Sequence, residues 1–140
     1  MTTYRFVHPI EVRYADLDPQ RHVNNAVVFS YLEAARAHYL EHLGLWNGAD
    51  FDEIGIILAE TSCRYLAPIV YGQSVEVAVA VTRLGTKSLT QDYVIRDRST
   101  GAELATGRAV LVAYDYRQGR SIPIAPEWRR VIEEFEGREE

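Results

Sequence analysis

The amino-acid sequence predicts one α+β domain, residues 1–140, in which a single antiparallel sheet covers one long apolar helix. The length is that of one compact domain. One long segment repeats apolar side chains every three or four positions, and four later segments alternate apolar and polar residues. A sheet that wraps one helix is an economical way to bury both apolar surfaces.

The first segment, residues 4–16, alternates around Ile10, Val12 and Tyr14, which predicts a first strand. The sequence LDPQRHVNN follows at 17–25. It collects Asp, Pro, Gln and two Asn, which is the composition of a turn and a helix cap. We therefore expect the chain to turn here and to enter a helix.

The long helix is expected at residues 24–43. Asn24 or Asn25 can cap its first turn, and Gly44 stands where a helix usually ends. The segment is apolar on more than one side, so we expect the helix to be largely buried. The side chains that recur at helical spacing are Val28, Leu32, Ala35, Tyr39 and Leu43.

The rest of the chain predicts an antiparallel sheet and a short terminal helix. After an exposed loop at 45–53, period-2 patterns predict four further strands at 54–65, 75–82, 89–96 and 102–114. Trp128, Val131, Ile132 and Phe135 then fit a short amphipathic helix. A sheet of about five strands with one helix leaves an open edge, which predicts self-association.

Composition excludes several functional classes. Hydrophobic residues make up 47% and charged residues 25%, the balance of a globular protein. The net charge of -5 and the scattered Lys and Arg residues argue against nucleic-acid binding. No apolar run approaches the roughly 18–20 residues of a membrane span, and the first residues lack a signal-peptide core, so we expect a cytoplasmic protein. Cys63, the single cysteine, has no partner for an internal disulfide.

The polar residues just before the helix are the candidates for chemistry. A turn and a helix cap are enough to explain the presence of Asp18, His22 and Asn25, and their spacing alone does not exclude this structural interpretation. The alternative rests on the helix N-terminus, whose free N–H groups stabilise a developing oxyanion. A carboxylate at Asp18 can attack a carbonyl carbon there or deprotonate a water that attacks it.

The motif D-x-D-P-x-x-H-V-N-N at residues 16–25, followed by SYLEAAR at 30–36, resembles the 4-hydroxybenzoyl-CoA thioesterase family of hotdog proteins and the related acyl-ACP thioesterases. The second Asp of this motif is the family's nucleophile or general base, and it matches Asp18. A His that contributes to the site in the acyl-ACP branch matches His22. Gln20 replaces an Asn of that branch, and Arg21 replaces a Gly found in many members.

The resemblance extends through residues 59–72 and 107–115, and so covers most of the chain. It implies the hotdog fold, in which five or six antiparallel strands wrap the central helix. It also implies hydrolysis of an acyl thioester to the free acid and CoA, without a metal or a redox cofactor. The backbone N–H groups of Val23, Asn24 and Asn25 would bind the oxyanion. Active sites would lie at the interface of a homodimer, which can pair again into a tetramer, with the acyl chain along the helix.

Three further residues are candidates for substrate binding. Glu60 lies in an apolar strand, where a charge is costly unless it is paired or faces a site. It can approach the site from a neighbouring subunit or form a salt bridge with an arginine. Lys87 and Ser88 lie in a hairpin turn and can contact CoA, although a solvated turn explains them equally well.

Other polar residues are expected to be structural. Asp16 ends the first strand and should cap the turn that follows, and Arg36 should pair with a carboxylate. Cys63 fits a small core residue better than a nucleophile. His38 and His42 have a spacing compatible with a metal, but no third ligand is evident, so surface or core histidines are favoured.

Three alternatives remain open at this point. The thioester carrier can be acyl carrier protein instead of CoA. A hotdog hydratase or dehydratase is a second possibility, but such enzymes use a differently spaced His motif. A non-catalytic acyl-CoA-binding domain is the third, and it would have little use for Asp18 next to an anionic ligand. The identity of the acyl group is open as well.

Overall fold

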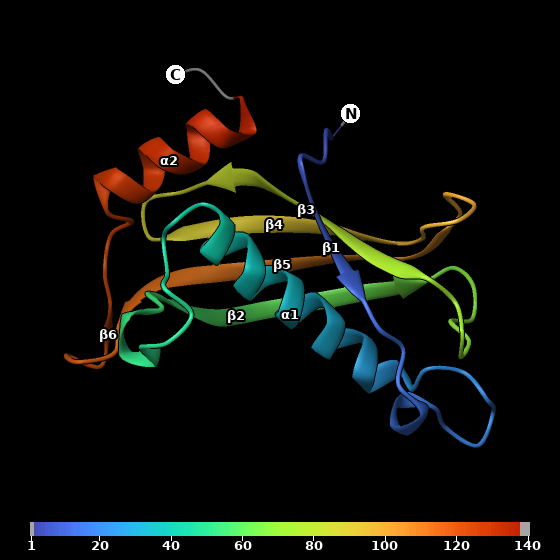
Figure 1. Ribbon diagram of the computed structural model, residues 1–140. Helices are drawn as coiled ribbons and strands as arrows, with labels where there is room; N and C mark the ends of the chain where they lie inside the picture. The colour runs from blue at the N-terminus through green and yellow to red at the C-terminus, as the bar shows by residue number, and fades with distance from the viewer. Residues whose placement is uncertain (1, 138–140) are drawn as a thin grey trace.

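One antiparallel sheet forms the body of the molecule, and one long helix lies across one of its faces (Figure 1). The computed structural model describes residues 2–137. The strand order is β1-β3-β4-β5-β2, with β6 paired to β5. All four strands expected after the helix are present. The strands are β1 (Phe6–Ile10), β2 (Ile56–Tyr65), β3 (Val75–Leu84), β4 (Ser88–Asp97), β5 (Glu103–Asp115) and β6 (Arg120–Ser121).

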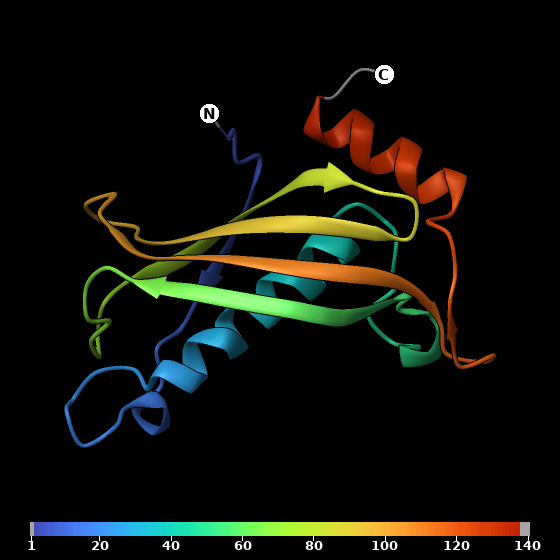
Figure 2. The same cartoon turned by 180° about the vertical axis from the view of Figure 1, so that it is seen from behind.

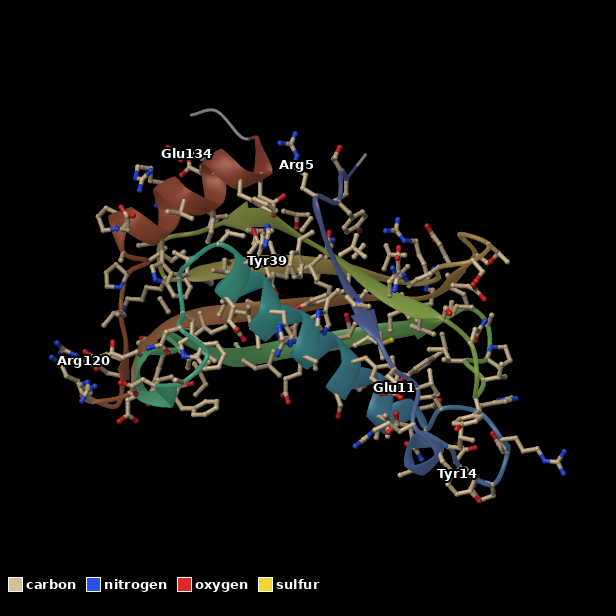
Figure 3. The ribbon with its side chains drawn as sticks, viewed as in Figure 1. Arg5, Glu11, Tyr14, Tyr39, Arg120 and Glu134 are labelled. Atoms are coloured by element: carbon tan, nitrogen blue, oxygen red, sulfur yellow. The ribbon has the colours of Figure 1, made fainter. Side chains whose placement is uncertain are left out.

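The first strand is shorter than its sequence pattern predicts. β1 ends at Ile10, and a 3-10 turn, η1 (Tyr14–Asp16), replaces the second half of the expected strand. Tyr14 is 81% exposed and lies on the outside of this turn (Figure 3), whereas Asp16 is buried. The prediction of a strand to residue 16 is wrong, because the backbone N–H and side chain of Arg13 bond the Asp16 carboxylate and turn the chain.

The central helix is α1 (Asn25–His42), close to the expected limits. Asn24 is its N-cap and accepts a hydrogen bond from the Ala26 N–H at 2.8 Å. Gly44 follows the helix with a φ of 74°, the left-handed conformation that ends many helices. The expectation of a largely buried helix holds for one face only, because the sheet covers a single side and leaves Glu33 and Glu41 exposed.

The terminal helix α2 (Pro126–Glu136) packs against β3, as its amphipathic pattern predicts. Its Ile132 is fully buried. The Glu136 carboxylate accepts a hydrogen bond from the Tyr39 hydroxyl at 2.7 Å and another from the Val81 N–H at 2.9 Å. One carboxylate therefore joins α1, β3 and α2. No helix within residues 2–137 is both long and apolar enough to cross a membrane.

Strand β2 forms a free edge of the sheet, seen from behind in Figure 2. It is exposed along most of its length, although its sequence is rich in apolar residues. Ile57 is 40% exposed, Leu58 43% and Tyr65 43%. An exposed strand edge with apolar side chains is a surface that proteins normally cover.

A glycine in β5 sets how closely α1 approaches the sheet. A Cβ atom at Gly107 would lie 2.8 Å from Leu32 Cδ1 on α1 and 3.2 Å from the carbonyl oxygen of Ser62 on β2. Leu32 is 1% exposed and has little room to move. The absence of a side chain at Gly107 therefore fixes the depth of the helix whose first residues build the candidate site.

We expect Gly107→Ala to destabilise the fold by about 1–3 kcal/mol, because overpacking forces the helix or the strand to shift. Urea unfolding of Gly107→Ala, Leu32→Ala and the double variant measures the coupling between the two positions. In the double variant the smaller side chain makes room for the new methyl group, so its destabilisation should be less than the sum of the two single losses. Additive effects would show that the helix does not depend on this contact.

Candidate active site

The residues before α1 form a tight loop. Leu17 pairs with Val23 as an isolated antiparallel bridge, and the Asp18 N–H donates to the His22 carbonyl at 2.9 Å. Arg21 has a φ of 67°, a left-handed conformation that glycine adopts without steric cost. Arg21 adopts it at some cost in strain.

Asp18 is held within this loop and not on a free surface arm. Its side chain is half-buried. Its Oδ1 accepts a hydrogen bond from the Gln20 N–H at 2.8 Å, which makes a local Asx turn. The carboxylate therefore has a defined position in the loop, seven residues before the first residue of α1.

Asp16, two residues earlier, anchors the loop to the core. Its carboxylate is 1% exposed and accepts hydrogen bonds from the Tyr31 hydroxyl at 2.7 Å and from Arg13 Nη2 at 2.8 Å. Burial alone would raise the pKa of Asp16, but the hydrogen bonds from Arg13 and Tyr31 outweigh it and lower the pKa. Its carbonyl also accepts the Asn24 N–H at 2.9 Å. The expected structural role of Asp16 agrees with this geometry.

The backbone donors at the helix start are not equally available. The Val23 N–H donates to the Ile69 carbonyl at 2.8 Å, and the Asn24 N–H is already bonded to Asp16. Of the three N–H groups expected to bind an oxyanion, only that of Asn25 has no acceptor among residues 2–137. One backbone N–H group, that of Asn25, is therefore open to an oxyanion at the start of α1, instead of the three expected from the sequence.

A cavity of about 280 Å³ opens beside this turn. His22 and Asn25 line it, so two of the polar residues singled out in the sequence meet there, while the half-buried Asp18 lies on the adjoining loop and not in the lining. The other lining residues come from the loop before α1, from α1, and from the end of β2 and the segment after it: Val23, Val28, Tyr65, Leu66, Ala67, Pro68 and Ile69.

Tyr65, at the end of β2, is a site residue that sequence reasoning missed. Its hydroxyl donates to the Asn25 carbonyl at 2.9 Å and so joins the end of the strand to the start of the helix. It also lines the cavity. Tyr65 lies in the segment 59–72 that resembles the family, but nothing in the sequence distinguishes it from the other residues of that segment.

The other proposed substrate-binding residues lie elsewhere in the chain. Glu60 is exposed in the middle of β2. Lys87 precedes β4 and Ser88 is its first residue, which aligns through Val112 of β5 with Ile57 of β2. They therefore lie at the end of the sheet opposite Tyr65 and the loop before α1. Within one chain, the fold does not bring them to Asp18.

The histidines and the cysteine make ordinary packing contacts. His38 stacks on His8 with ring centroids 4.0 Å apart, and His42 packs edge-on against Phe135 at 5.6 Å. Burial raises the pKa of the Cys63 thiol, which disfavours the reactive thiolate. Across the described part of the chain, no group of three His, Cys, Asp or Glu residues is placed to hold a metal ion.

Arg36 differs from its expected role. Its Nε donates to the Tyr93 hydroxyl at 3.0 Å, and no carboxylate of residues 2–137 forms an ion pair with it. The expectation of a carboxylate partner is therefore wrong for the described residues. The reason is that the sheet face below this part of α1 presents a tyrosine and a glutamine instead of an acid.

Comparisons with known proteins agree with this architecture. The profile of the thioesterase-like superfamily matches residues 12–132. A thioesterase from Thermus thermophilus, solved with coenzyme A and zinc, is 34% identical, with a TM-score of 0.86 over 99% of this chain and 100% of that chain. The PA5185 protein of Pseudomonas aeruginosa PAO1 is 29% identical, with a TM-score of 0.82 over 94% of this chain and 92% of that one. FadM, a long-chain acyl-CoA thioesterase of Escherichia coli K12, is 26% identical over 90% of this chain and 96% of its own length.

We expect Asp16→Asn to lower the free energy of unfolding by about 1.5–3 kcal/mol at pH 7, because Arg13 and Tyr31 lose a charged acceptor. Since the folded pKa of Asp16 is lowered, its contribution is full above the unfolded Asp value of about 4 and disappears as the pH falls through the folded pKa. The gap between wild type and variant should therefore narrow in acid. Urea unfolding at pH 7 and pH 3 measures this, with the exposed Asp52→Asn as control. A gap that stays constant would show that Asp16 does not carry the effect.

Proposed function

This chain belongs to the thioesterase-like superfamily, and from that premise we propose that it is an acyl-CoA thioesterase that hydrolyses an acyl thioester to the free acid and CoA. The observation that carries the proposal is the half-buried Asp18 carboxylate, held by an Asx turn in the loop that leads into α1. The Thermus relative solved with coenzyme A supports CoA as the carrier. FadM supports a fatty acyl group.

Asp18 is the reacting carboxylate in this proposal. It either attacks the thioester carbon or takes a proton from a water that attacks it. In the first route the C–S bond breaks as Asp18 forms a mixed anhydride with the acyl group, and water then hydrolyses the anhydride to the free acid and the Asp18 carboxylate. In the second route the activated water adds to the carbonyl carbon, and the C–S bond then breaks. In both routes CoA leaves as the thiolate and takes up a proton. The Asn25 N–H, at the positive end of the helix dipole, stabilises the carbonyl oxygen as it gains charge.

His22 and Asn25 orient the thioester from the cavity wall in the same proposal. The Val23 and Asn24 N–H groups act indirectly: their bonds to Ile69 and Asp16 fix the loop and leave Asn25 as the open donor. Glu60 and the turn at Lys87 and Ser88 are not placed beside the reacting carbonyl in this proposal, and a neighbouring subunit can bring them to the substrate.

We further propose that the active form is a homodimer joined along β2, with the tetramer as a second level of assembly. The free edge of β2 has unpaired backbone groups and exposed apolar side chains. Pairing with a second copy would satisfy both. It would also bring a second chain beside the cavity at the end of the same strand.

Thiol release from a panel of short, medium, long and aromatic acyl-CoAs tests the activity. We expect turnover with at least one ester and a loss of about 100-fold or more in kcat for Asp18→Asn, because the amide neither attacks nor accepts a proton. Glu127→Gln, an exposed carboxylate on α2, is the control and should leave kcat unchanged.

The outcomes separate the alternatives. Release only from acyl carrier protein thioesters would change the carrier. Binding of acyl-CoA without release from any ester would favour a non-catalytic binding domain. If Asp18→Asn retained full activity, the assignment of the carboxylate would be incorrect.

For the dimer, we expect Leu58→Glu to shift the mass measured by light scattering toward the monomer, because it places a charge in an apolar strand interface. The control is Thr61→Glu, three residues along the same exposed strand, which alters a polar position. It should have a smaller effect. A wild-type protein that is monomeric at micromolar concentration would contradict the proposed assembly.

A further inference from the structure

Arg36 is a buried cation without a carboxylate partner in the described chain. Its side chain is 7% exposed, and no Asp or Glu oxygen of residues 2–137 lies within 4.0 Å of its guanidinium nitrogens. The guanidinium lies 5.8 Å from the centre of the Tyr93 ring, which offsets part of the cost of burial. Burying a positive charge without an anion is still costly, so this position calls for a partner.

The hydrogen bonds around Arg36 leave donors unused and acceptors occupied. Arg36 Nε donates to the Tyr93 hydroxyl, which in turn donates to Gln91 Oε1. Gln91 is fully buried, and its Nε2 has no acceptor among residues 2–137. What these three hydrogen-bonded side chains lack is an acceptor, and the positive charge of Arg36 favours a negatively charged acceptor.

The unused part of Arg36 faces a second cavity. Gln91 Nε2 is the only fully buried side-chain nitrogen or oxygen without a partner in the described residues. The Nη1 and Nη2 atoms of Arg36 also lack a partner among these residues, so they must reach open space. That space is a cavity of about 320 Å³ lined by Arg36 and mainly by apolar side chains, including Leu40, Trp46, Ile56, Leu58 and Leu111. Glu33 lines it too, but does not pair with Arg36.

We propose that this cavity binds the far end of the acyl group and that Arg36 recognises a terminal carboxylate there, so the preferred substrates are ω-carboxyacyl thioesters. The proposal rests on the proposed thioesterase function and names its substrate class. The apolar wall accepts the methylene chain, and the guanidinium supplies two N–H donors in the geometry that a carboxylate matches.

The two cavities follow one side of α1. Asn25 lines the first and Arg36 the second. Eleven positions of helix separate them, which is about three turns and about 16 Å. An extended chain covers roughly 3.3–3.6 Å per three bonds, so roughly fourteen bonds span this distance. A long-chain diacid derivative therefore has the length to reach from one cavity to the other, and it must pass outside the close contact of Leu32 with Gly107 to do so.

The test compares ω-carboxyacyl-CoAs with methyl-ended acyl-CoAs of equal length, from six to sixteen carbons, on wild type and Arg36→Met. We expect kcat/KM of the wild type to favour the carboxylated ester by about 10- to 100-fold, most strongly near fourteen carbons. Arg36→Met should remove this preference and leave the methyl-ended esters at wild-type rates or above. Arg83→Met, which removes an exposed arginine on β3, is the control and should keep the preference.

Two further readouts separate this inference from the function on which it rests. Calorimetric titration with tetradecanedioate and its dimethyl ester needs no turnover; the diacid should bind wild type and lose affinity in Arg36→Met, while the diester should not change. Tetradecanedioate should also raise the melting temperature of the wild type and not that of Arg36→Met, because a ligand stabilises only the protein that binds it. Absence of this shift in the wild type, or no preference for the carboxylated ester at any length, would overturn the inference. Absence of thiol release from every ester would reject the thioesterase proposal and leave the titration to decide this one.

Discussion

The buried carboxylate of Asp16 is the interaction on which the candidate site depends. It bonds Arg13, which turns the chain out of β1, and Tyr31, which lies on the buried face of α1. Its own carbonyl fixes the Asn24 N–H at the helix cap. The loop that carries Asp18 is thus attached to strand, helix and cap through a single residue. The two carboxylates of the D-x-D motif have separate tasks, one structural and one proposed to be chemical.

Much of the fold was predictable because its patterns are local. The period of two in β3 and β5 and the period of about 3.6 in α1 report which side of each element faces the core. The pattern failed at residues 11–16, where alternation continued although a side chain–backbone contact with Asp16 ended the strand. Alternation describes which side chains are apolar, and it contains no information about a competing hydrogen bond.

The candidate site was predictable to the extent that it lies on one continuous segment. His22 and Asn25 meet in the cavity because they are close in sequence. Tyr65 and Ile69 complete the site from the end of β2 and the segment after it, and only the tertiary fold places them there. The Val23 and Asn24 N–H groups bond the carbonyls of Ile69 and Asp16, and these tertiary contacts cannot be read from the sequence either. The missing partner of Arg36 likewise becomes evident only when the sheet below the helix is known.

Glu136 has a consequence for the order in which the fold is completed. Its carboxylate accepts from Tyr39, 97 residues earlier in the chain, and from Val81, 55 residues earlier. A ribosome therefore delivers the helix and the strand well before the group that satisfies their buried donors. During synthesis the tyrosine hydroxyl and the strand amide must stay hydrated, so the contact between α1 and β3 is sealed against water only when α2 arrives. The nascent protein keeps one side of its core open until α2 has left the exit tunnel.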